Sequence, residues 1–149
     1  MKKVFATFSV LFVSLAIFAQ NAAPQKKAED FIKFKEVTYD FGKIKQGTPV
    51  THDFLFTNIS DQPVVIEYAQ ASCGCTTPTW PQAAIAKGKT DKLSAGFNAA
   101  TPGQFSKPIT IKVAGVDAPM QITITGTVLS PEDYTKYEAA KKNGKAGSK

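Results

Sequence analysis

Two cysteines that stand one residue apart are the residues whose type and spacing most directly suggest chemistry. Cys73 and Cys75 are the only cysteines of the chain, and they flank Gly74. A fully extended Cys-x-Cys segment separates its Cα atoms by about 7 Å, whereas a disulfide favours roughly 4.4–6.8 Å. A bond between the two sulfurs therefore requires a bend at the middle residue, and glycine is the residue type that bends most readily.

The pair is open to three interpretations. The sulfurs can form a local disulfide turn, which would be small, strained and easily reduced, or they can stay a reduced pair that closes a loop. They can act as two thiolate ligands of a metal ion, or they can exchange with other thiols. Bonds to another chain are a further alternative. Two thiolates and one imidazole would suit Cu(I) or Zn(II), and His52 is the only histidine. If the strands around a turn at Asp61 are antiparallel, His52 lies level with Gln70, at the same end of the domain as Cys73 and Cys75.

His52 and Trp80 each have a simpler interpretation. A histidine at the start of a strand often lies half-buried with one satisfied hydrogen bond. Trp80, the only tryptophan, can cover the end of a hydrophobic core. Alternatively it is a contact residue for a partner, because tryptophan is enriched in that role.

Ordinary catalytic constellations are missing from the sequence. A Ser-His-Asp or Cys-His arrangement needs a histidine beside its nucleophile, and no motif surrounds His52. The cysteine spacing also lacks the two-residue spacer and the helix start of typical redox dithiols. We therefore predict that the protein is not an enzyme.

The charge pattern argues against nucleic-acid binding. The formal net charge is +6, but between Asp30 and Val128 nine lysines face eight acidic residues, which leaves +1. The chain contains no arginine, the residue best suited to base edges and to bidentate phosphate contacts. We expect a protein or cell-envelope partner and no nucleic acid.

The first residues have the pattern of a secretory signal peptide. The basic start Lys2-Lys3 is followed by an apolar run over residues 4–18 and then by Ala19. The run is shorter than the roughly 20 residues that span a bilayer, and no cysteine follows it as a lipid attachment site. We predict a signal peptide over residues 1–19 and an exported protein, periplasmic or extracellular, without a lipid anchor or a stable membrane span after cleavage.

Short apolar runs separated by Gly, Pro, Asn and Asp fill the middle of the chain. In Val50–Asn58 the residues His52, Phe54 and Phe56 fall on one face, which is the period of two typical of a half-buried strand. The strands predicted in this way are Phe34–Phe41, Val50–Asn58, Val64–Ala71, Lys92–Asn98, Phe105–Val113 and Met120–Val128.

These runs predict an all-β domain, an immunoglobulin-like antiparallel β-sandwich of about seven strands. We assign residues 20–30 to a linker, 31–128 to the sandwich and 129–149 to a polar, lysine-rich tail. The tail is expected to be helical from Pro131 and disordered over residues 142–149. The predicted core residues are Phe54, Phe56, Ile66, Tyr68, Phe97, Ile109, Ile111, Ile122 and Ile124.

Several segments resemble the secreted bacterial family numbered 1573 among the domains of unknown function. They are YDFGKI (39–44), FLFTNISDQPVVI (54–66), SCGCTTPTWP (72–81), IAKGKTDKL (85–93), GQFSKPITI (103–111) and ITITGTV (122–128). The resemblance covers nearly the whole predicted sandwich and departs from the family's usual IAPGK at Lys87. It implies an immunoglobulin-like fold similar to sperm-protein and ciliary scaffold modules, which serve mainly in protein binding.

Two hypotheses for function remain. The first is an exported, non-catalytic binding or scaffold module that acts by protein–protein contact, through an exposed strand edge or through Trp80. The second is a periplasmic Cu(I)- or Zn(II)-binding or thiol-redox protein that uses Cys73 and Cys75, with His52 as a further metal ligand. Apart from that ion, no cofactor is predicted.

Overall fold

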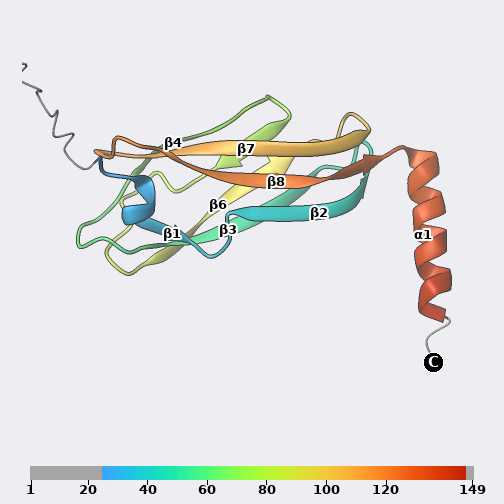
Figure 1. Cartoon of the computed structure of the whole chain (residues 1–149), viewed down its shortest axis with the longest axis horizontal. Helices are drawn as coiled ribbons and strands as arrows, with labels where there is room; N and C mark the ends of the chain where they lie inside the picture. The colour runs from blue at the N-terminus through green and yellow to red at the C-terminus, as the bar shows by residue number, and fades with distance from the viewer. Residues whose placement is uncertain (1–24, 147–149) are drawn as a thin grey trace, which may run out of the picture.

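Two four-stranded β-sheets pack face to face in the computed structural model, which describes residues 25–146 (Figure 1). The strands are β1 (Ile32–Phe34), β2 (Thr38–Lys45), β3 (Val50–Asn58), β4 (Ile66–Ala71), β5 (Thr76–Thr79), β6 (Thr90–Phe97), β7 (Gly103–Val113) and β8 (Met120–Leu129). One sheet has the order β1-β3-β6-β5 and the other the order β2-β8-β7-β4. The predicted all-β sandwich is confirmed, with eight strands.

The first predicted strand, Phe34–Phe41, is divided between the two sheets. The chain pairs with β3 along β1, then crosses to the other sheet, where β2 begins at Thr38. β2 runs parallel to β8, so one strand pair in an otherwise antiparallel sandwich is parallel. β2 also continues through Gly42, at which φ is +66°, because the glycine lies in a bulge between Asp40 and Lys43 and does not end the strand.

The sequence does not predict β5, which contains Pro78 and has no apolar alternation. It forms because its residues pair antiparallel with β6, from Thr76 opposite Phe97 to Thr79 opposite Ser94. A proline is tolerated there because β5 is the edge of its sheet.

Alternate side chains of the central strands fill the space between the sheets. All but one of the predicted core residues are buried; the exception is Tyr68, which is 38% exposed. A register irregularity between Ile66 and Tyr68 directs the tyrosine outward and places Ala69 in the core. The core prediction for Tyr68 is therefore wrong.

The domain begins earlier than the sequence suggested. Residues 20–30 were expected to be a linker, but Ala28–Asp30 form a 3₁₀ helix, η1, that packs on the sandwich. Ala28 is buried, and its backbone N–H donates a hydrogen bond to the carbonyl oxygen of Ala118 at 3.0 Å. The predicted signal peptide lies outside the described residues.

The helix α1 (Pro131–Ala146) follows β8 directly and projects away from the sandwich (Figure 1). Its start agrees with the prediction, but it continues beyond Lys142, where disorder was expected. The Lys43 ammonium lies 4.9 Å from the ring centroid of Tyr137, which joins the helix to β2. Within residues 25–146, no helix has the length and apolar character needed to cross a membrane.

Trp80 closes the side of the sandwich on which the edge strands β4 and β5 meet. The indole packs half-buried against the core, and its Nε1–H donates a hydrogen bond to the carbonyl oxygen of Ile66 at 3.2 Å. Trp80 follows β5 and Ile66 lies in β4, so a single side chain connects the two sheets. The structure thus places Trp80 over the core.

A stacked aromatic pair connects the sheets at one end. Phe105 of β7 stacks on Phe97 of β6 with ring centroids 4.2 Å apart, and it lies opposite Gly126 of β8. A Cβ on Gly126 would come within 2.8 Å of the Phe105 ring and 2.9 Å of the carbonyl oxygen of Gly42. The absence of a side chain at Gly126 is what allows the ring of Phe105 to cover that strand.

Gly126→Ala is expected to lower the free energy of unfolding by about 1–3 kcal/mol, the usual effect of an extra methyl group in a packed core. Gly74→Ala is the matched control, because a Cβ there would meet no atom within 4 Å. Urea unfolding followed by Trp80 fluorescence measures both variants. Equal stability of the two would contradict the close packing of Phe105 on Gly126.

Trp80→Phe is expected to lower the free energy of unfolding by about 1 kcal/mol, because the carbonyl oxygen of Ile66 loses its donor. Urea unfolding followed by circular dichroism measures the change without the tryptophan signal. Tyr134→Phe on α1 is the aromatic control and should leave stability unchanged. A Trp80→Phe protein as stable as the wild type would show that the indole N–H does not help to hold the sheets together.

Candidate functional site

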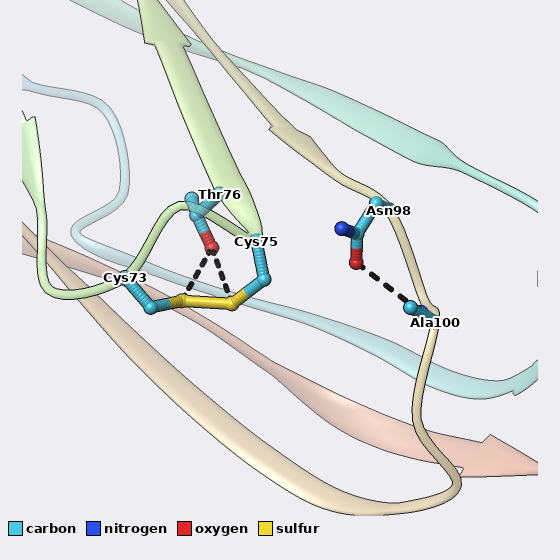
Figure 2. Close-up of a disulfide and its surroundings, with 5 residues drawn as sticks. All are labelled: Cys73, Cys75, Thr76, Asn98 and Ala100. Atoms are coloured by element: carbon cyan, nitrogen blue, oxygen red, sulfur yellow. Dashed lines mark hydrogen bonds between the residues drawn. A yellow bond between two sulfur atoms is a disulfide. The ribbon is translucent and has the colours of Figure 1, made fainter.

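The cysteine segment lies where the chain passes from one sheet to the other, between the edge strands β4 and β5. The sulfurs of Cys73 and Cys75 are bonded to each other, and their Cα atoms are 5.3 Å apart (Figure 2). Backbone hydrogen bonds hold the segment at both ends. Ser72 N–H donates to the carbonyl oxygen of Pro108 at 3.3 Å, and Asn98 N–H donates to that of Cys75 at 3.1 Å.

The turn between the cysteines does not need the special backbone freedom of glycine. Gly74 is not among the residues with positive φ, and a Cβ added to it would meet no atom within 4 Å. The ring that the disulfide closes is also too small to restrict the unfolded chain strongly. Chain-entropy reasoning gives roughly 1.6 kcal/mol for a three-residue loop, against roughly 3 kcal/mol for fifteen residues. The disulfide is therefore a minor source of stability.

A buried hydroxyl group points at both sulfurs. Thr76 is only 3% exposed, and its Oγ1 lies 3.9 Å from the Sγ atoms of both Cys73 and Cys75. Figure 2 shows this oxygen facing the disulfide. Among the described residues the two sulfurs are the only partners of the hydroxyl. Neutral sulfur accepts hydrogen bonds weakly and an ionised acceptor accepts them strongly, so this hydroxyl is better suited to a thiolate than to a disulfide.

A hollow of about 250 Å³ opens beside the disulfide, and Lys107 is the only charged residue that lines it. Ile109, Ile111 and Val113 of β7 are buried, so Lys107 occupies a core-facing position of the same strand. Ala71 of β4 pairs with Ile109. If the same antiparallel register continues past Ala71, the start of the cysteine segment lies beside Lys107. The other lining residues include Cys75, Phe97, Asn98, Gln104 and Phe105.

Thr76 and Lys107 were not among the candidate site residues predicted from the sequence. A signal for Lys107 was present, because its position relative to Ile109 and Ile111 places it on the apolar side of a predicted strand. Thr76 has no such signal, since its burial depends on the pairing of β5 with β6.

The structure does not bring His52 to the cysteines. Its Nε2 lies 2.8 Å from Glu36 Oε1, and its ring stacks on Tyr39 with centroids 3.5 Å apart. Although β3 and β4 follow each other in the chain, they belong to different sheets, and β6 separates β3 from β5. Across the described part of the chain, no group of three or more His, Cys, Asp or Glu residues is placed to hold a metal ion. His52 is therefore a half-buried histidine with one hydrogen bond. This agrees with the simpler of the two interpretations drawn from the sequence, and not with a metal ligand.

An exposed ion pair lies on the outer face of the β3–β6 pair. Lys92 Nζ is 2.7 Å from Asp53 Oδ2, and the Ser94 hydroxyl donates to the same carboxylate. These hydrogen bonds from Lys92 and Ser94 lower the pKa of Asp53, and the bond to Asp53 raises the pKa of Lys92. Both ions face solvent, where such pairs contribute little to stability. The arrangement keeps both groups charged and offers no poised acid or base.

A second hollow, of about 470 Å³, lies on the outer face beside β1. We call its lining the β1 surface: Lys33, Phe34, Lys35, Leu55, Thr57 and Thr90. Leu55 is 41% exposed, and the charged members of this surface are two lysines. Trp80, the partner-contact candidate from the sequence, lies outside this surface, and its N–H is already bonded to Ile66.

Solved structures share this fold at low sequence identity. A PapD-like (ASH) domain of human CEP192 is 9% identical, with 82% of this chain and 99% of that chain covered and a TM-score of 0.56. A protein of unknown function from Porphyromonas gingivalis W83 is 13% identical, covering 75% of this chain and 51% of that one, with a TM-score of 0.56. The secreted serine protease VesC from Vibrio cholerae is 13% identical over 74% of this chain and 26% of that one, with a TM-score of 0.54.

These similarities show the fold alone, and the chain spans only part of the two bacterial proteins. No curated protein matches the sequence. A family model described as "Protein of unknown function (DUF1573)" matches residues 32–128, which begin with the first residue of β1 and end within β8. The match contains the cysteine segment and confirms the resemblance drawn from the sequence. The chain belongs to the DUF1573 family of proteins of unknown function.

Proposed function

We propose that the protein is an exported, non-catalytic module that binds a protein of the cell envelope or its surroundings through the β1 surface. The observation that carries the proposal is an exposed leucine that shares a hollow with two lysines, beside the free edge of a short strand. An exposed apolar side chain in a hollow with a polar rim is typical of a protein contact. Among the described residues, no histidine, cysteine or carboxylate lines this hollow.

The backbone of β1 supports the same proposal. The carbonyl oxygen of Phe31 accepts a hydrogen bond from Ile59 N–H at 2.9 Å, and Lys35 N–H donates to the carbonyl oxygen of Leu55 at 2.8 Å. Because bonding alternates along an antiparallel strand, the backbone groups of Ile32 and Phe34 point away from β3. An extended segment of a partner can add to such an edge.

The charges of the β1 surface define the chemistry of the partner segment. Lys33 and Lys35 are both exposed and lie on either side of Phe34. No carboxylate is among the residues that line this hollow. A partner segment with acidic side chains at alternate positions and an apolar side chain for the contact with Leu55 would complement it.

A photo-crosslinking amino acid at position 55 is expected to capture a discrete envelope protein in living cells, and Lys33→Glu combined with Lys35→Glu should abolish the product. The same crosslinker at Thr110, on the outer face of the other sheet, is the control. With the purified partner, Leu55→Glu should weaken binding by at least about 30-fold, as expected for a central contact residue. Equal products from positions 55 and 110, or unchanged binding by Leu55→Glu, would contradict the proposed surface.

Export is tested by the N-terminus of the mature protein. The protein expressed with its own first residues should be recovered outside the cytoplasm and should begin close to Gln20, because the small residue Ala19 precedes the expected cleavage point. Intact mass and N-terminal sequencing measure this. Replacing residues in the apolar run 4–18 with charged ones should retain the full-length chain in the cytoplasm. A wild-type protein that keeps Met1 and remains cytoplasmic would contradict export.

A further inference from the structure

We infer that the Cys73–Cys75 disulfide is a thiol–disulfide exchange site that accepts two electrons from a dithiol, such as a peptide segment with two reduced cysteines. The inference does not rest on the proposed binding function. It uses the other edge of the β1-β3-β6-β5 sheet, and the β1 surface shares no residue with the hollow beside Cys75.

Both cysteines keep part of their surface exposed in the folded protein. Cys73 and Cys75 are both half-buried, and Cys75 lines a hollow of about 250 Å³ whose wall includes the stacked rings of Phe97 and Phe105. A cysteine side chain that enters this hollow meets Cys75 first. The structure therefore assigns Cys75 as the sulfur that is attacked and Cys73 as the first leaving group.

Two neighbouring groups favour the thiolates that the exchange produces. The buried Thr76 hydroxyl lies 3.9 Å from both sulfurs and has no oxygen or nitrogen partner among the described residues, so it is free to donate to either thiolate. Lys107 supplies positive charge to the same hollow, and within residues 25–146 it takes part in no salt bridge. A hydrogen-bond donor and a cation beside a cysteine both stabilise its thiolate.

The reaction balances with a dithiol as the reductant. One substrate thiolate attacks Cys75, the Cys73–Cys75 bond breaks, and Cys73 leaves as a thiolate that accepts a hydrogen bond from Thr76. The second substrate thiolate attacks the substrate sulfur of the mixed disulfide, and Cys75 leaves. The substrate gains a disulfide and loses two electrons and two protons, and the protein becomes a dithiol.

The reduced protein keeps its fold for a structural reason. The hydrogen bonds that anchor the crossing at Ser72 and at Cys75 come from the backbone and do not involve sulfur. The small ring contributes little to stability, so opening it leaves the crossing between the sheets in place. Reduction is thus a local event.

The first experiment measures the redox equilibrium of the purified protein in glutathione buffers, with thiols trapped by alkylation and counted by mass. The wild type should become reduced in glutathione buffers in which structural disulfides of secreted proteins stay oxidised. Thr76→Val should shift the equilibrium toward the disulfide by about tenfold, whereas Thr76→Ser, which keeps the hydroxyl, should not. Thr79→Val on the same strand is the control. Trp80 fluorescence checks that each protein remains folded.

The second experiment measures rates. Lys107→Gln should slow alkylation of the reduced protein by iodoacetamide at neutral pH by several-fold, and Lys89→Gln should not. Incubation with a reduced peptide that carries two cysteines should yield one oxidised peptide per wild-type molecule. A slower or shifted reaction in Thr76→Val or Lys107→Gln, with unchanged controls, supports the proposal.

The proposal is overturned by a folded wild-type protein that stays oxidised in reduced glutathione, or by exchange that neither substitution alters. It is also overturned by a reduced protein that binds stoichiometric Zn²⁺ and fails to oxidise the peptide, which would identify a metal site. Leu55→Glu should exchange like the wild type. That variant therefore separates a failure of the redox proposal from a failure of the proposed binding function.

Discussion

The packing of two apolar sheet faces against each other is the constraint on which the rest of the structure depends. Stacked sheets lie about 10 Å apart, so every connection between them must cross that thickness. The chain makes five such crossings, and two of them, from β1 to β2 and from β4 to β5, join strands that are sheet edges. The β1 surface lies beside the first of these edges, and the cysteine segment joins β4 to β5.

The strands that alternate strictly were predictable, and those decided by pairing were not. Val50–Asn58 has the bounds that its period of two indicated. β1 and β2 appeared to be one strand because no glycine or proline interrupts Phe34–Phe41, yet Glu36 and Val37 are both exposed where the chain crosses. The burial of Thr76 and the outward turn of Tyr68 depend on partners that are distant in the sequence.

Only part of the candidate site could be predicted from the sequence, for the same reason. The cysteines were evident by residue type, and their spacing limited the states of the sulfurs to a few. The neighbours that give those sulfurs their chemical character come from β5 and β7, which meet only in the folded chain. The expected neighbour, His52, was excluded by the assignment of β3 and β4 to different sheets, a choice that local periodicity does not determine.

The parallel pairing of β2 with β8 has a consequence for the order in which the protein folds. β8 lies between β2 and β7. β2 therefore has no strand partner in this sheet until β8, the last strand of the sandwich, has emerged. Such a pairing between strands far apart in sequence forms late and slowly. A chain that emerges from the ribosome N-terminus first therefore carries an unfinished sheet until β8, its final strand, is free.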